Sequence, residues 1–247
     1  MFKWSESDKI VLPLMIVAII ALAIILHFAL KHKSAKIKKL PLQILALTLI
    51  VLEFGKQFYF IFLDTYVTYA LPIHFCTLIF VLIALAQFLP EKVAKFFKAP
   101  AFIFSIIVLI LVLVHPKSMI GNSTQNIFGT FTNFHTFTFH FTVIAYPIFS
   151  IALSNYIPKL KHCLNLCCSI IFYATYAIPL AFHFNSNYVN ILRSDFAPLE
   201  NFRLSAGQVA YDIVLFLIGI GASCLILIIY WSIYKLIKKQ RRNKYES

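Results

Sequence analysis

Seven long apolar blocks separated by short basic loops constrain this chain more than any other feature of its sequence. They lie at residues 10–30, 40–62, 69–89, 100–115, 136–155, 164–184 and 208–234. About 20 apolar residues in a helix, rising about 1.5 Å each, cross the hydrocarbon core of a bilayer. Only 13% of the 247 residues are charged, against about 25% in a soluble domain. We therefore expect an all-α polytopic bundle of seven transmembrane helices, forming one membrane domain.

The loop charges predict the orientation of this bundle. Basic residues gather in every second loop and in the tail 235–247, sixteen in all: Lys31, Lys33, Lys36, Lys38, Lys39, Lys92, Lys95, Lys98, Lys159, Lys161, Lys235, Lys238, Lys239, Arg241, Arg242 and Lys244. Five lie on the other side: Lys3, Lys9, Lys117, Arg193 and Arg203. The positive-inside rule then places the N-terminus outside and the tail in the cytoplasm. We expect a multi-pass protein of the plasma membrane. If one of the seven blocks does not cross the bilayer, we expect it to be the short one at 100–115.

The net charge of +13 has the same explanation. In a soluble protein it would suggest nucleic acid as a partner, but here the charges follow the loops. No stretch between the predicted spans exceeds about 25 residues, so no separate soluble domain is expected. We predict no nucleic-acid partner, and the sequence names no protein partner.

The five cysteines do not form a recognisable framework or metal site. They are Cys76, Cys163, Cys167, Cys168 and Cys224. Three lie at the predicted cytoplasmic end of one span, where thiols stay reduced, so we expect no structural disulfide. Together with His162 they do not have the spacing of a zinc site. We expect no metal and no cofactor.

Ionisable side chains inside the apolar blocks are the strongest functional signal. Charges are costly in a bilayer, so each is a candidate for function. The predicted topology places nearly all of them at the outer level, on five helices: Glu53, Lys56, Asp64, His74, His135, His140, His183 and Asp212. Glu53, Lys56 and Gln57 share one helix face by their spacing. We interpret the set as lining a polar cavity that opens outward; the alternative is a set of structural ion pairs and headgroup contacts.

Cys76 is a candidate nucleophile, provided that another helix supplies a base. His74 and Cys76 lie about 200° apart on a regular helix, so they share a pocket only if Pro72 distorts the first turn. His135 and His140 are about 140° apart, so only one of them is expected to be the base. A thiol activated by histidine is an acyl-transfer nucleophile. A lone buried cysteine is more often an inert small hydrophobe, and spacing alone leaves both interpretations open.

Three short motifs resemble those of a known family. The segment LPIHFC at 71–76 resembles the LPLHLC motif of the YwaF-like family of bacterial integral membrane proteins. The segment 139–141 resembles that family's second histidine helix, although Phe141 stands where a glycine is expected. The segment NYVNIL at 187–192 resembles its asparagine–tyrosine segment, and Glu53 stands where its acidic residue is expected.

This family is in turn similar to the eukaryotic transmembrane protein 164 group, which is linked to acyl transfer onto ether phospholipids through a membrane cysteine. By that resemblance Cys76 would be the nucleophile and His140 the base. The candidate catalytic residues are therefore Cys76, His140 and His74. The candidate substrate-binding residues are Glu53, Lys56, His135, Asn187, Tyr188 and Asp212.

Three functions remain open. The first is an acyltransferase or lipase acting on membrane lipids, which predicts Cys76 within a few ångströms of a histidine. The second is a transporter or substrate-binding subunit for a small solute, with a pocket lined by Glu53, Lys56, His74 and Asp212. The third is a non-catalytic scaffold whose basic tail holds anionic lipid.

Overall fold

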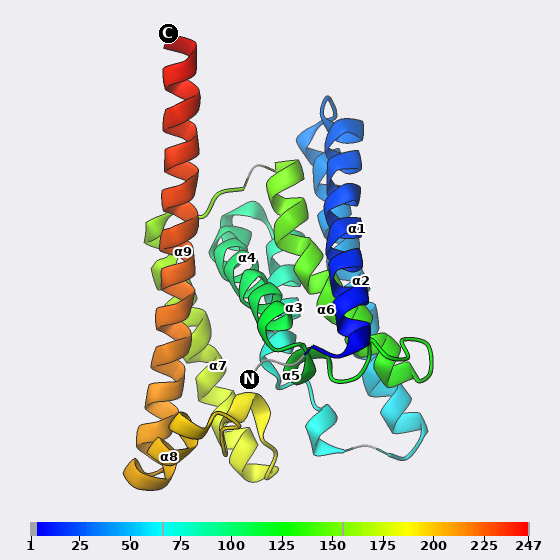
Figure 1. Ribbon diagram of the computed structural model, residues 1–247, viewed down its shortest axis with the longest axis vertical. Helices are drawn as coiled ribbons and strands as arrows, with labels where there is room; N and C mark the ends of the chain where they lie inside the picture. The colour runs from blue at the N-terminus through cyan, green and yellow to red at the C-terminus, as the bar shows by residue number, and fades with distance from the viewer. Residues whose placement is uncertain (1–3, 66, 155, 247) are drawn as a thin grey trace. The chain divides into compact units, whose positions relative to one another are not determined.

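The computed structural model describes residues 4–65, 67–154 and 156–246, and all regular secondary structure in that part of the chain is helical (Figure 1). The chain divides into two compact units, Met1–Tyr156 and Ile157–Ser247, here named unit 1 and unit 2. Lys3 and the side chains of residues 241–247, which entered the charge argument, lie outside the described part.

Unit 1 is built from six α-helices: α1 (Glu6–Leu30), α2 (Ala35–Phe62), α3 (Phe75–Phe88), α4 (Glu91–Val114), α5 (Pro116–Ile120) and α6 (Phe131–Phe149). A 3₁₀ turn at Thr68–Ala70 precedes α3, and a π-helical turn at Ser150–Ser154 extends α6. α3 packs against α4, and α2 packs against both α3 and α6. α1 packs against α6 and its π-helical extension. The α2–α3–α6 contacts place the start of α3 beside α6.

Side-chain caps define several of the helix ends in unit 1. Ser5 Oγ accepts from the Asp8 amide at 3.1 Å, and the Asp8 carboxylate accepts from the Ser5 amide at 2.8 Å, which makes a capping box at the start of α1. At the starts of α2 and α6, the hydroxyls of Ser34 and Thr130 accept from the amides of Ile37 and Asn133. Asp8 also accepts a 2.7 Å hydrogen bond from Thr124, which ties α1 to the loop before α6.

In the described part of the chain, six helices are long and apolar enough to cross a membrane: Glu6–Leu30, Ala35–Phe62, Glu91–Val114, Phe131–Ser154, Leu160–His183 and Gln208–Gln240. The predicted span that proves too short is the third block, at 69–89, and not the fourth, at 100–115. The block at 69–89 forms only the 14-residue α3, about 21 Å long, because the residues before Phe75 form a 3₁₀ turn followed by further turns and bends. The block at 100–115 lies almost entirely within the 24-residue α4. This helix is longer than the predicted span because its first turns carry lysines and so were not counted as apolar.

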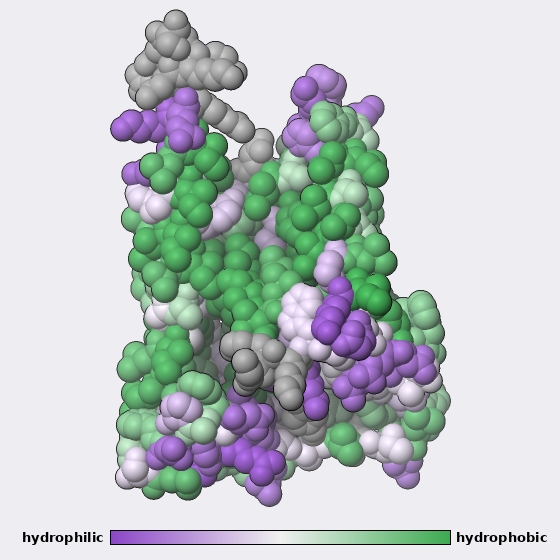
Figure 2. Space-filling view, in the orientation of Figure 1, coloured by the Kyte–Doolittle hydropathy of each residue, from purple (hydrophilic) through white to green (hydrophobic). Residues whose placement is uncertain are grey.

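The two ends of unit 1 differ in charge, and an apolar surface separates them. The α1–α2 turn and the start of α4 carry Lys31, Lys33, Lys36, Lys38, Lys39, Lys92, Lys95 and Lys98. The opposite end holds the capping box and the loops before α3 and α6 (Figure 1). Between them, large apolar side chains such as Leu14, Ile25 and Phe28 are exposed, and the surface is a continuous hydrophobic band (Figure 2). This is the surface expected of a protein that faces lipid.

Unit 2 contains α7 (Cys163–His183), α8 (Ala197–Ala206) and α9 (Gln208–Glu246), with 3₁₀ turns at Leu160–His162 and Tyr188–Asn190. α9 packs against both α7 and α8. Gly207, at a φ of 87°, separates α8 from α9, since this left-handed conformation costs glycine little. The predicted basic tail continues α9 as a helix to Glu246.

Candidate functional site

Cys76 and His140 form a contact between α3 and α6. The Cys76 Sγ lies 3.3 Å from the His140 Nε2 atom, although the two residues are 64 positions apart in the chain. Both side chains are half-buried. The structure therefore brings the predicted nucleophile within hydrogen-bond distance of one of the predicted histidines.

The second ring nitrogen of His140 determines which tautomer faces the thiol. His140 Nδ1 lies 2.7 Å from the carbonyl oxygen of Thr136, one turn earlier in α6. A carbonyl oxygen only accepts, so Nδ1 carries the proton in this contact. Nε2 is then the unprotonated nitrogen, and its lone pair faces Cys76. This is the tautomer that a general base requires.

The start of α3 places Cys76 at a helix N-terminus. His74 is the N-cap residue, with an extended backbone at φ −65° and ψ 152°. Its carbonyl oxygen accepts from the amides of Thr77 and Leu78, so the helix begins at Phe75 and Cys76 lies in its first turn. Cys76 therefore lies beside the positive end of the helix dipole. The predicted separation of about 200° between His74 and Cys76 does not apply, because His74 lies before the helix rather than on it.

The predicted polar face of α2 forms a buried ion pair. Lys56 Nζ lies 2.7 Å from Glu53 Oε1, and the side chains are 14% and 5% exposed. Gln57 Nε2 donates to the same Glu53 oxygen at 2.8 Å and to the Ala70 carbonyl oxygen at 2.9 Å. The pair thus satisfies its own charges, and Gln57 ties it to the turn that leads into α3. Sequence spacing put Gln57 on this face without assigning it a role.

Electrostatic interactions connect this ion pair to the cysteine and the histidines. Lys56 interacts with both Cys76 and His135. His140 interacts with His74 and with His135. Six predicted residues are therefore grouped in unit 1, and we name them the Cys76 cluster: Glu53, Lys56, His74, Cys76, His135 and His140.

His135 does not contact the thiol. It is buried, at 7% exposure, and its ring stacks on Phe139 with centroids 5.4 Å apart. Its Nε2 has no hydrogen-bond partner among the described residues. Of the two α6 histidines, His140 alone reaches Cys76, in agreement with their predicted separation around the helix.

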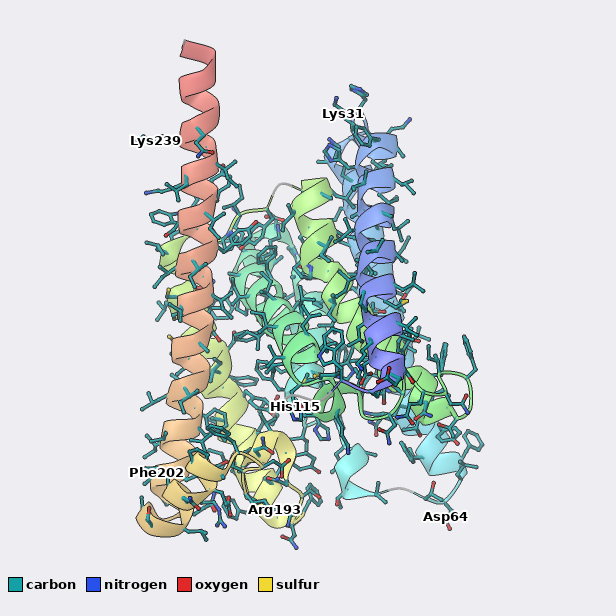
Figure 3. All side chains as sticks on the ribbon, in the orientation of Figure 1. Lys31, Asp64, His115, Arg193, Phe202 and Lys239 are labelled. Atoms are coloured by element: carbon teal, nitrogen blue, oxygen red, sulfur yellow. The ribbon has the colours of Figure 1, made fainter. Side chains whose placement is uncertain are left out.

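Three ionisable residues from the predicted set lie outside the cluster: Asp64, His183 and Asp212. Asp64 is exposed beyond the end of α2, away from the helices of unit 1 (Figure 3). His183 is exposed at the end of α7 in unit 2, where its ring meets that of Phe184 edge-on. A polar cavity around the Cys76 cluster, open to the outside, stays a prediction.

The remaining predicted site residues belong to unit 2 and make local contacts there. Asn187 Oδ1 accepts from the amides of Leu192 at 2.9 Å and Arg193 at 3.2 Å, so this side chain closes the loop after α7. Tyr188 is fully buried, and burial raises the pKa of its phenol. Asp212 is also buried and accepts from Gln208 Nε2 at 2.9 Å. Their role in binding a substrate stays a prediction.

The loop between α7 and α9 holds an ion pair that the sequence did not reveal. Arg203 donates to both carboxylate oxygens of Glu200, and the Ser194 amide donates to Glu200 Oε2 at 2.8 Å. These contacts, first of all the Arg203 hydrogen bonds, lower the pKa of Glu200 to about 2. Glu200 therefore joins α8 to the preceding segment.

The thiols of the described structure are free, and Cys163, Cys167 and Cys224 interact with one another between α7 and α9. Among the described residues, no group of three or more histidine, cysteine, aspartate or glutamate side chains is arranged to hold a metal ion.

The comparisons with known proteins give one match. The model of the TMEM164 family matches residues 1–230, which include all the predicted site residues. No curated protein and no solved structure matches the chain. The resemblance of the motifs to the YwaF-like proteins stays a prediction, whereas the more distant resemblance to the transmembrane protein 164 group is confirmed. With its match spanning both units and nearly the whole sequence, this membrane protein belongs to the TMEM164 family.

Proposed function

We propose that this protein is a lipid acyltransferase or lipase in which Cys76 is the nucleophile and His140 the general base. The observation that carries the proposal is the 3.3 Å contact from Cys76 Sγ to His140 Nε2. The bond from His140 Nδ1 to Thr136 supports it, because it leaves Nε2 free to take the thiol proton. An inert buried cysteine would not need a histidine held in this tautomer.

The reaction follows from these two side chains. The thiol proton moves to His140 Nε2 while Sγ attacks the carbonyl carbon of a lipid ester. The carbon–oxygen ester bond breaks, and the departing alkoxide takes the proton from His140, which leaves a thioester on Cys76. An acceptor hydroxyl, from a lysolipid or from water, then loses its proton to His140 and attacks the thioester. The acyl group leaves on the acceptor, and the proton returns to Sγ.

The other members of the Cys76 cluster have supporting roles in this proposal. Lys56 interacts electrostatically with Cys76, and Glu53 holds Lys56 in place through their ion pair. The positive N-terminus of α3 is placed to stabilise the oxyanion that forms next to Cys76. His74, before the helix, and His135 complete the polar surroundings.

The charge distribution supports an outward-facing site in the plasma membrane. The lysines gather at the end of unit 1 where α3 ends and α4 begins, whereas Cys76 lies in the first turn of α3. By the positive-inside rule, the lysine end is cytoplasmic and the Cys76 cluster lies toward the outside. In this topology α3, together with the turns before it, also crosses the membrane, which makes seven crossings in all.

Trapping the thioester tests the proposal directly. The purified protein is reconstituted into liposomes whose phospholipid carries an isotope-labelled acyl chain, and Cys76 is analysed by mass spectrometry before and after hydroxylamine. We expect a hydroxylamine-sensitive acyl adduct and transfer of label to an added lysolipid or to water. Cys76→Ser abolishes both, and the matched control Cys168→Ser, at an exposed thiol of unit 2, leaves both unchanged. Transfer that persists in Cys76→Ser overturns the proposal.

A further inference from the structure

A pocket of unit 1 has a volume of about 350 Å³ and lies at the lysine end, away from the Cys76 cluster. The first turns of α2, the end of α3, α4 and the end of α6 form its wall. We name it the lysine pocket, after the polar residues that line it: Lys38, Lys39, Gln87, Lys98, Tyr146 and Tyr156. No residue of the Cys76 cluster lines it, so the pocket is a separate feature.

The lysine pocket has more positive charge than its own residues neutralise. Lys98 Nζ is bound by both carboxylate oxygens of Glu91, at 2.7 and 2.8 Å. Lys38 and Lys39 are half-buried, and neither forms an ion pair among the described residues. Glu91 also interacts electrostatically with Lys39 and Lys95, so its single negative charge is shared among several lysines. The pocket keeps an excess of positive charge, which is unfavourable for half-buried cations and favours an anion beside them.

The position of these lysines on α2 strengthens the argument. They lie within the first five residues of the helix, whose first turn contains no acidic residue. The N-terminus of a helix dipole is positive, so it favours anions and disfavours lysines. An anion in the pocket would be attracted by the lysines and by the helix end together.

Buried polar atoms in the same pocket also lack partners. Gln87 is 3% exposed and its Nε2 donates to the Tyr146 hydroxyl at 2.9 Å, while its Oε1 has no partner among the described residues. The Tyr146 hydroxyl can donate as well as accept, so the Gln87 amide can turn and present its NH₂ group instead. The buried Tyr156 hydroxyl likewise has no partner in the described structure. The pocket thus offers hydrogen-bond donors beside its two lysines.

The wall contributed by α6 is a π-helical turn, Ser150–Ser154, which follows Pro147. Such turns are rare and occur frequently at functional sites. Here the turn places Leu153 and the hydroxyl-bearing Ser150 and Ser154 along the pocket. The Ser150 hydroxyl donates to the Tyr146 carbonyl oxygen at 2.8 Å, and this bond connects the π-helical turn to the end of α6.

We propose that the lysine pocket binds a phosphate group, from either an anionic phospholipid headgroup or a soluble phosphate ester. Phosphate oxygens only accept hydrogen bonds, which fits two lysine ammonium groups, a tyrosine hydroxyl and a rotatable amide. The site is independent of acyl transfer at Cys76, because it uses other residues at the opposite end of unit 1.

The test compares two variants that each remove two positive charges. Lys38→Gln/Lys39→Gln changes the pocket, and Lys33→Gln/Lys36→Gln changes exposed lysines of the same segment. Purified protein in a neutral detergent is titrated with phosphatidylglycerol, with phosphatidylcholine and with sn-glycerol 3-phosphate, and the unfolding temperature is measured. Binding to the folded state raises this temperature by an amount that grows with the logarithm of the ligand concentration divided by Kd.

We expect phosphatidylglycerol, but not phosphatidylcholine, to raise the unfolding temperature of the unmodified protein. The pocket variant should lose at least tenfold in apparent affinity, and the exposed-lysine variant should stay within twofold. A matching rise with sn-glycerol 3-phosphate, also lost in the pocket variant, would assign the pocket to soluble phosphate esters. Equal losses in the two variants, or no response to any phosphate ligand, overturn the proposal.

Discussion

His140 bonds through Nδ1 to the Thr136 carbonyl oxygen 2.7 Å away, and this contact within one helix orients its other nitrogen toward a thiol on a different helix. A histidine that bonds to the carbonyl four residues earlier has a fixed ring plane and a fixed tautomer. The orientation of the His140 ring is therefore set within α6, and α3 has only to bring Cys76 next to it.

Replacing His140 should remove the base without removing the nucleophile. His140→Gln is expected to lower the rate of acyl transfer by roughly 10²–10⁴-fold, the contribution typical of a general base. His135→Gln is the matched control on the same helix, and it should lower the rate less than tenfold because His135 does not contact the thiol. Initial rates in proteoliposomes measure both. Equal losses in the two variants would contradict the assignment of the base to His140.

The Glu53–Lys56 ion pair should matter most when only one partner is removed. Lys56→Met leaves a carboxylate that is 5% exposed without its cation, and breaking such a pair costs about 3–5 kcal/mol of unfolding free energy. The double variant Glu53→Gln/Lys56→Met removes both charges and should recover most of that loss. Reversible unfolding of the purified protein in mixed micelles measures the difference. A double variant that is no more stable than Lys56→Met would refute this account.

The Asp8–Thr124 hydrogen bond should stabilise unit 1 across 116 residues of sequence. Thr124→Val keeps the shape of the side chain but removes the hydroxyl that donates to a buried carboxylate, and a hydrogen bond to a charged group contributes about 1.5–3 kcal/mol. Thr132→Val, at an exposed threonine near the start of α6, is the control and should change the free energy of unfolding by less than about 0.5 kcal/mol. Indistinguishable variants would show that the bond contributes nothing.

Acid should release the loop that Glu200 holds in unit 2. The pKa of Glu200 is lowered to about 2 from its ordinary value of 4.5. A carboxylate whose pKa is lowered on folding stabilises the folded state fully above its unfolded pKa, and the contribution disappears as the pH falls through the folded value. The hydrogen bond from the Ser194 amide to Glu200 should therefore persist at pH 4 and weaken toward pH 2.

Hydrogen exchange at the Ser194 amide measures this release, after correction for the intrinsic pH dependence of exchange. The Glu200→Gln variant is the control, because its side chain does not titrate and its protection should not change with pH. Loss of protection already between pH 5 and pH 4 would contradict the lowered pKa.

The sequence determined the features that depend on neighbours along one helix. The apolar blocks predicted the all-helical membrane fold, since hydropathy over about 20 residues is a local property. The spacing of Glu53 and Lys56 predicted a shared face, and the two side chains form an ion pair. The 140° between His135 and His140 predicted that only one of them would reach the thiol, because that angle is fixed by the helix itself.

Only the tertiary structure decided how the helices meet and where they begin. Helical spacing did not reveal that α3 starts at Phe75, which leaves His74 outside the helix and shortens the predicted third span. Nor did it reveal that His140, rather than His135, faces Cys76, since the choice depends on the rotation of α6 about its axis. A third case is the hydrogen bond between Asp8 and Thr124, because Thr124 lies in a loop whose path cannot be predicted from helical periodicity. Local periodicity fixes which residues share a face, whereas packing against other helices fixes the direction of that face.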